Sequence, residues 1–161
     1  RNPLLTAPGG LLKGLSMSTN VASPVRFKRA VPQFTVPDVV RTAEYYRDTL
    51  GFQIAGYWDG EKASFSTDPP PYFAIVWRDE VQVYLGRDES PQPTIPTSEG
   101  GNHAYFHIDG VDALAEELRS RGATILDGPE DRIYHQREVI VQDCNGFVLA
   151  FGEETRSAPT D

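Results

Sequence analysis

Two histidines four residues apart, His103 and His107, have the clearest chemical potential in this chain. Imidazole rings bind metal ions, transfer protons or accept hydrogen bonds from a ligand. They lie in the stretch GNHAYFHIDGVDAL, residues 101–114, with Tyr105 between them. Because side chains alternate along a strand, His103, Tyr105 and His107 are expected on one face. Histidines four apart on a strand are about 13 Å apart, so a metal ion held by either would need ligands from elsewhere.

The usual signatures of an enzyme site are absent from the sequence. There is no Gly-x-Ser-x-Gly nucleophile elbow, no phosphate-binding Gly-x-x-x-x-Gly-Lys, no Cys-x-x-Cys and no His-Glu-x-x-His. Cys144 is the single cysteine, so no intrachain disulfide forms and a reducing, cytoplasmic location is expected. No local cationic motif activates its thiol.

The charge of the chain is negative and unevenly placed. The 161 residues include 15 Lys and Arg against 23 Asp and Glu, a formal net charge of −8. Residues 1–30 hold five of the basic residues and no acidic one, so the remaining 10 basic and 23 acidic residues give a balance of −13. An acidic body argues against nucleic acid as a partner, because nucleic-acid-binding proteins present a cationic surface. No apolar run reaches the roughly 20 residues of a membrane span, so no membrane partner is expected.

The N-terminal segment differs from the rest of the chain. The stretch RNPLLTAPGGLLKGLS lacks periodicity and is rich in Gly and Pro, and the following MSTNVASP resembles a natural start at Met17. We interpret residues 1–29 as an N-terminal extension, either a remnant of expression or a basic, acid-free transit peptide. They are left out of the fold prediction.

Two stretches of the body, 31–54 and 103–125, follow the same pattern. Each opens with alternating residues, passes an Asp/Gly turn, continues as an amphipathic helix, ends on Gly and resumes as a strand. The two helices align at an offset of 72 residues, with Val39 against Val111. This agreement across several elements indicates an internal repeat.

Residues at the ends of the two helices support their boundaries. Asp38 and Asp109 are predicted to cap the N-termini, since a short carboxylate accepts hydrogen bonds from the first free N–H groups. Gly51 and Gly122 are predicted to follow the C-termini in the left-handed conformation.

Strand-like segments complete each repeat. They are 52–57, 72–78 and 81–87 in the first, and 123–126, 137–143 and 147–153 in the second. The sequence therefore predicts an α+β protein of two tandem βαβββ modules, whose curved mixed sheets form a cleft between their free faces. The expected boundaries are 30–87 for the first module, 88–101 for a linker, 102–154 for the second module and 155–161 for a C-terminal tail.

The paired modules, with VPDVVRTAEYYRDTLGF and HIDGVDALAEELRSRGA, resemble the vicinal oxygen chelate superfamily of glyoxalases, bleomycin-resistance proteins and extradiol dioxygenases. The resemblance covers roughly residues 30–153. It implies four metal-ligand positions, one on the first and one on the last strand of each module. Here they hold Val31, Tyr84, His103 and Ala150.

Of these four side chains, His103 alone is a usual metal ligand, whereas a divalent catalytic site generally needs three. The resemblance is therefore to the bleomycin-resistance branch, whose members bind and sequester a drug, and no metal or other cofactor is expected. The alternative is a metal-dependent lyase, isomerase or dioxygenase with a rearranged site that uses His103, His107 and a carboxylate. A third possibility is a catalytically silent interaction domain.

Strand alternation predicts which residues line the cleft. Phe34 and Val36 are expected under the first helix, and Phe106 and Ile108 under the second, so that the opposite parity faces the ligand. An aromatic pocket with a few hydrogen-bonding groups suits a small molecule, an antibiotic or a metabolite. The predicted ligand-binding residues are Gln33, Thr35, Trp58, Trp77, Gln82, Tyr84, His103, Tyr105 and His107.

The family resemblance also implies a homodimer, since drug-binding members commonly complete their clefts across a subunit interface. Exposed strand edges in paired modules favour such symmetric association.

Overall fold

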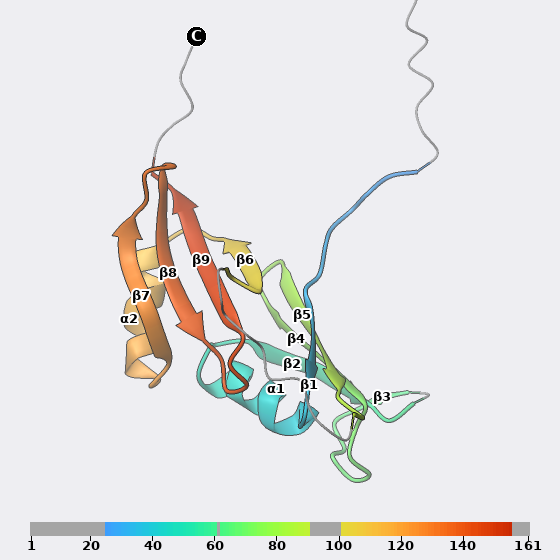
Figure 1. The fold of residues 1–161 in the computed structure, drawn as a ribbon. Helices are drawn as coiled ribbons and strands as arrows, with labels where there is room; N and C mark the ends of the chain where they lie inside the picture. The colour runs from blue at the N-terminus through green and yellow to red at the C-terminus, as the bar shows by residue number, and fades with distance from the viewer. Residues whose placement is uncertain (1–24, 61, 91–100, 156–161) are drawn as a thin grey trace, which may run out of the picture.

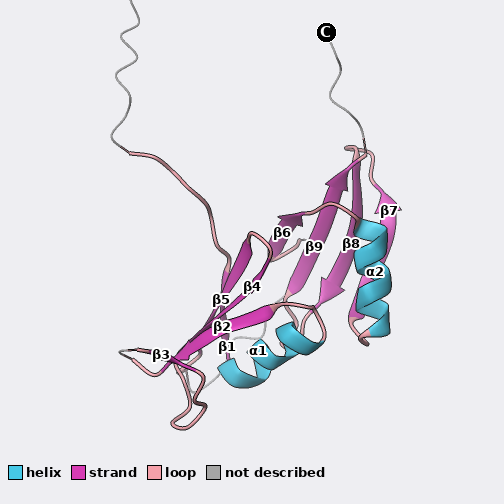
Figure 2. Ribbon diagram, turned by 180° about the vertical axis from the view of Figure 1, so that it is seen from behind, coloured by secondary structure: helices cyan, strands magenta, loops and turns pink. Residues whose placement is uncertain are grey.

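The computed structural model describes residues 25–60, 62–90 and 101–155. Its two sheets lie side by side (Figure 1), and each carries one helix on one of its faces (Figure 2). The first module consists of β1 (Gln33–Val36), α1 (Val39–Asp48), β2 (Gln53–Trp58), β3 (Ala63–Ser64), β4 (Phe73–Arg78) and β5 (Val81–Arg87). The second consists of β6 (Ala104–His107), α2 (Val111–Ser120), β7 (Thr124–Asp131), β8 (Gln136–Gln142) and β9 (Val148–Glu154).

The two sheets repeat one topology, which confirms the predicted α+β class and the pair of βαβββ modules. The strand orders are β1-β5-β4-β2-β3 and β6-β9-β8-β7. In each module the first strand pairs in parallel with the last, and the remaining neighbours pair in antiparallel fashion. The short strand β3 adds an edge to the first sheet and was not predicted.

The helix ends follow the sequence signals with one exception. Asp38 accepts a hydrogen bond from the N–H of Arg41 at 2.9 Å, and Gly51 and Gly122 have φ of +75° and +76°. The predicted cap Asp109 is wrong, because the N-cap is Gly110, in the left-handed region, and it has no side chain.

The N-terminus of α2 is instead capped from the far end of the chain. The carboxylate of Glu153, on β9, accepts hydrogen bonds from the N–H groups of Gly110 and Val111. A negative charge at this end also complements the helix dipole. A cap supplied across 42 residues leaves no local pattern in the sequence.

The core forms where the strands meet the helices. Phe34 and Val36 on β1 are 5% and 0% exposed, and Phe106 on β6 is 6% exposed, as the alternation predicted. Ile108 is half-buried and packs against the same core. No helix of the described residues covers the opposite faces of the two sheets, and we call these the open faces.

We call the boundary between the two modules the seam. There the helix of each module packs against the last hairpin turn of the other module. The hydroxyl of Tyr46 on α1 donates to the carboxylate of Asp143, beside the β8–β9 turn, at 3.0 Å. Arg78, beside the β4–β5 turn, donates to Glu117 on α2 at 2.8 Å. Burial raises the pKa of Asp143, whereas the hydrogen bond from Arg78 lowers the pKa of Glu117.

Several predicted segments lie largely outside the described residues. These are residues 1–24 of the N-terminal extension, 91–100 of the linker and 156–161 of the tail. Among the helices of the described ranges, none is long and apolar enough to cross a membrane.

Candidate functional site

The open face of the first sheet carries a row of aromatic rings. Trp58 on β2 meets Phe73 on β4 edge to face, with ring centroids 5.8 Å apart, and Phe73 meets Tyr84 on β5 in the same way at 5.3 Å. All three rings are partly exposed. Trp58 and Tyr84 belong to the predicted set, while Phe73 does not. The alternation of YFAIVWR puts Phe73 on the same face as Trp77 and could have revealed it.

Polar side chains border this aromatic row. Gln33 on β1 pairs in register with Tyr84, and Gln82 pairs with Trp77 across β4 and β5. Thr35 lies beside Gly86, which has no side chain to cover it. Gln33 and Thr35 are exposed, whereas Gln82 and Trp77 are half-buried. The face therefore combines flat apolar rings with hydroxyl and amide groups, which suits a planar ligand with a few polar substituents.

A hollow of about 460 Å³ lies where the open faces meet at the seam. It brings together four of the nine predicted residues, namely Gln82, His103, Tyr105 and His107. Val31, one of the four metal-ligand positions, lines it as well. Of the other five predicted residues, Trp58, Trp77 and Tyr84 carry rings on the first open face, and Gln33 and Thr35 border them. The predicted set thus divides between a seam hollow and an adjoining aromatic face.

His103 is held by the backbone of the neighbouring strand. Its Nδ1 accepts a hydrogen bond from the N–H of Val148 at 2.8 Å, and its own N–H donates to the carbonyl of Val148 at 2.8 Å. Its ring also meets Phe147 edge to face at 5.2 Å. An N–H that donates to Nδ1 occupies that lone pair, so the neutral ring carries its hydrogen on Nε2, which can donate to a ligand.

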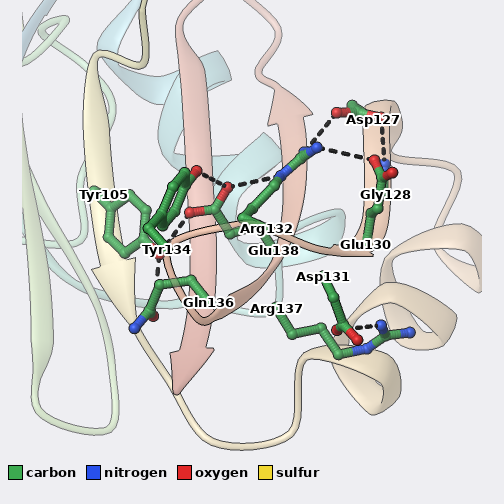
Figure 3. Close-up of polar contacts among 10 residues, drawn as sticks. All are labelled: Tyr105, Asp127, Gly128, Glu130, Asp131, Arg132, Tyr134, Gln136, Arg137 and Glu138. Atoms are coloured by element: carbon green, nitrogen blue, oxygen red, sulfur yellow. Dashed lines mark hydrogen bonds and ion pairs between the residues drawn. The ribbon is translucent and has the colours of Figure 1, made fainter. Parts of the chain in front are cut away.

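Tyr105 leads to a network that the sequence interpretation missed. Its hydroxyl crosses β9 and donates to Glu138 on β8 at 2.8 Å. Glu138 is 2% exposed and also accepts from Arg132 at 3.1 Å and from the hydroxyl of Tyr134 at 2.8 Å (Figure 3). Arg132 in turn pairs with Asp127. Burial and the hydrogen bond to Glu138 raise the pKa of Tyr105 to about 12.

This network closes much of the second open face with the chain's own side chains. Tyr105 reaches Glu138 because its ring lies over Gly152, where an added Cβ would overlap the tyrosine hydroxyl. His107, whose ring centroid is 5.0 Å from that of Tyr105, stays exposed beside it. The buried carboxylate of Glu138 accepts hydrogen bonds from three donors, which hold the side chain in place. The one signal in the sequence is the charged Glu138 within the apolar strand REVIVQ.

The four metal-ligand positions implied by the resemblance do not form a ligand set. Val31 and Ala150 carry no donor atom, the ring of Tyr84 belongs to the aromatic row, and His103 is held as described above. Across the described ranges, no group of three or more His, Cys, Asp or Glu side chains is arranged to hold a metal ion. In this arrangement the described side chains offer stacking and hydrogen bonding.

Comparisons with known proteins agree with this architecture. Residues 27–151 match the family described as Glyoxalase/Bleomycin resistance protein/Dioxygenase superfamily. A curated relative, a 2-epi-5-epi-valiolone epimerase from Actinomyces sp, is 28% identical over a region that covers 60% of this chain and 61% of that protein. The chain thus spans about three fifths of the length of this relative.

Two solved structures share the fold at low sequence identity. TioX from Micromonospora sp. ML1 superposes with a TM-score of 0.60 at 16% identity, covering 80% of this chain and 99% of TioX. TnmS3, an antibiotic binding protein from Streptomyces sp. CB03234, superposes with a TM-score of 0.55 at 22% identity, covering 81% of this chain and 99% of TnmS3.

Proposed function

Since this chain belongs to the glyoxalase/bleomycin resistance protein/dioxygenase superfamily, we propose that it binds a small organic molecule, an antibiotic or a metabolite, without a metal ion. Where the ligand is an antibiotic, sequestration by this protein confers resistance. The TnmS3 structure, described as that of an antibiotic binding protein, supports this class of ligand. A cytoplasmic location and the absence of a nucleic-acid partner belong to the same proposal.

The observation that carries the proposal is the composition of the first open face. Trp58, Phe73 and Tyr84 present rings in a row, with Gln33 and Thr35 exposed beside them. Aromatic stacking and edge contacts contribute about 0.5–1.5 kcal/mol each beyond the area they bury. Such a surface holds a planar ligand by its faces and orients it by its polar edge.

A thermal-shift screen of antibiotics and metabolites against metal-free protein tests this proposal. A ligand present at 100 times its dissociation constant stabilises the fold by about 2.7 kcal/mol, a shift that is readily measured. Tyr84→Ala should weaken binding about tenfold, or ~1.4 kcal/mol. Phe65→Ala, which removes a ring that is 73% exposed and has no ring contact with this row, is the matched control. Binding that disappears with a chelator and returns with one equivalent of metal would contradict metal independence.

The second candidate function is a metal-dependent isomerase, lyase or dioxygenase with a rearranged site. The similarity to a 2-epi-5-epi-valiolone epimerase favours an isomerase among these. In that case His103 would have to give up the hydrogen bond from Val148 and carry its proton on Nδ1, so that Nε2, His107 and a carboxylate could converge on one ion. Elemental analysis of purified protein distinguishes the two functions: near-stoichiometric Zn, Fe, Mn or Ni, lost in His103→Ala, would establish the enzyme and remove the binding protein.

The homodimer expected from the family resemblance completes the proposal. No helix from the described part of the chain lies over the open face of the first sheet, and a second copy of the chain would supply the opposite wall of the ligand site. Sedimentation at micromolar concentration should give twice the chain mass of 17.8 kDa. A species of the single-chain mass alone would remove this part of the proposal.

A further inference from the structure

A second hollow lies at the seam, away from the aromatic row, and adjoins the first hollow, with which it shares Glu80, Val81, Phe106 and His107. We call it the α2 hollow, because it lies between α2 and the β4–β5 turn. Its volume is about 580 Å³, within the range of about 300–1,000 Å³ typical of small-molecule pockets. Phe106 and Leu114 contribute to its apolar lining, and Asp79, Glu80 and Asp109 to its polar lining.

The corresponding space in the other half of the molecule is filled by the chain itself. There Phe147, in the β8–β9 connection, stacks on Phe34 with ring centroids 4.3 Å apart. Asn145 in the same connection donates to the hydroxyl of Thr42 on α1 at 2.9 Å. At the 72-residue offset, Phe34 and Thr42 correspond to Phe106 and Leu114, both of which line the α2 hollow.

The difference arises from the length of two turns. Five residues, 143–147, connect β8 to β9, whereas Asp79 and Glu80 alone connect β4 to β5. The short turn supplies no ring to place against Phe106, which stacks instead on Phe151 of β9 with ring centroids 5.2 Å apart. The α2 hollow is therefore the unfilled counterpart of a position that accepts an aromatic ring in the other half.

The charge of the hollow selects the kind of molecule. Asp79, Glu80 and Asp109 are exposed, and none of them forms an ion pair with another described residue. Among the described residues that line the hollow, two carry basic side chains: Arg78, which is already bound to Glu117 and to the carbonyl of Leu50, and the exposed His107. The rim thus has an excess of negative charge above an apolar floor.

We propose that the α2 hollow is a second binding site, which takes a small organic cation carrying an aromatic or aliphatic ring. The ring lies against Phe106 and Leu114, and the ammonium or guanidinium group lies between the carboxylates of the β4–β5 turn and Asp109. This site is independent of the ligand proposed for the first open face.

Titration of 15N-labelled protein with 2-phenylethylammonium tests the proposal, with 2-phenylethanol and 3-phenylpropionate as neutral and anionic analogues. The cation should shift the amide signals of Asp79, Gly110 and Ala113 saturably. It should bind at least about fivefold more tightly than the neutral analogue, since one charge pair at 4 Å is worth about 1 kcal/mol even in water. The anion should not bind. Equal affinities for all three, or no saturable shift, would overturn the proposal.

Two variants with matched controls locate the site. Ala113→Phe, at an exposed position of α2 that lines the hollow, should abolish binding of the cation by filling the space. Glu116→Phe adds the same ring to the same helix outside the hollow and should leave binding within about twofold. Unchanged binding in Ala113→Phe would overturn the assignment.

The charge is tested separately. Asp79→Asn/Glu80→Gln should weaken cation binding about fivefold or more, and asparagine tolerates the positive φ of +50° at position 79. Glu44→Gln/Asp59→Asn removes two exposed carboxylates elsewhere and should change affinity less than twofold. Equal losses in the two double variants would show a general charge effect and overturn the site. Tyr84→Ala, on the first open face, should leave binding of the cation to the α2 hollow unchanged. The two proposed sites can therefore fail or succeed separately.

Discussion

The two modules have the same topology and use it to build different surfaces. Both helices have ten residues, and both first strands pair in parallel with the last strand of their own module. At the seam, however, the long β8–β9 connection places the buried Asp143 against Tyr46 of α1 and the half-buried Phe147 on Phe34 of β1, whereas the short β4–β5 turn leaves the α2 hollow beside α2. The longer connection therefore fills, with its own side chains, a position that the shorter turn leaves open.

The open faces of the two modules also differ from each other. The first is a row of rings with neutral polar neighbours. The second is occupied by Tyr105, Tyr134 and Arg132, which all donate to the buried Glu138. A duplicated fold thus supplies one face for stacking and one that is largely closed by its own hydrogen bonds. Substitutions at equivalent positions measure this difference directly.

The largest difference is expected between Gly51→Ala and Gly122→Ala. Both glycines follow their helices with left-handed φ, which costs alanine about 1–2 kcal/mol. A Cβ at Gly122 meets open space, but one at Gly51 lies 2.6 Å from Arg78 Nη1 and 2.6 Å from Glu117 Oε1. Gly51→Ala should therefore cost about 3–4 kcal/mol, because it also displaces the ion pair across the seam.

Urea denaturation of the two variants measures this difference. Gly122→Ala serves as the control, since its backbone strain is the same and its surroundings are empty. Equal losses of unfolding free energy would mean that the contact between Arg78 and Glu117 adjusts without cost, and that the seam tolerates movement there.

A smaller difference is expected between Gly152→Ala and Gly86→Ala. These glycines occupy equivalent positions on β9 and β5, opposite His107 and Thr35. A Cβ at Gly152 would force the Tyr105 ring away and remove a donor from buried Glu138, at a cost of about 2 kcal/mol.

Gly86→Ala is the control for this prediction. The nearest atom to its Cβ is Gln33 Nε2 at 3.7 Å, an ordinary contact, so stability should change by less than about 1 kcal/mol and in the favourable direction. Thermal unfolding of both variants checks the prediction. A stable Gly152→Ala would show that Tyr105 is dispensable to the second face.

The sequence predicted the repeat because its signals are local. Strand alternation placed Phe34 and Phe106 in the core, and the preference for glycine after a helix placed Gly51 and Gly122 at the helix ends. Each of these predictions needs only a few neighbouring residues. The cap of α2 escaped prediction because Glu153 reaches it from a distant strand. The hydrogen-bond network around Glu138 was not predicted either, because its members come from different strands.

Tyr105 on β6 reaches Glu138 on β8 only because β9, the strand between them, has no side chain at Gly152. Which residue of β9 lies beside Tyr105 depends on the register of the strands, and the residue pattern of one strand does not give that register. Alternation assigned Tyr105 to the open face, but it could not say that the chain's own Glu138 would engage its hydroxyl. The size of the α2 hollow was equally hidden, since it depends on how two turns of unequal length meet two helices.

The smallest effect concerns pH, and its sign should differ between the two seam contacts. Burial raises the pKa of Asp143, so the folded state binds a proton more readily than the unfolded chain. The stability of the protein relative to Asp143→Asn should therefore fall as pH rises through the interval above the ordinary value of 3.8. Arg78 lowers the pKa of Glu117, so stability relative to Glu117→Gln should rise with pH and be lost below its ordinary value of 4.5. Urea unfolding of the three proteins between pH 3 and 7 measures both slopes. Slopes of the same sign would show that Asp143, despite its burial, is stabilised as a carboxylate by the hydroxyl of Tyr46 and the turn N–H groups, and that the two contacts across the seam are electrostatically alike.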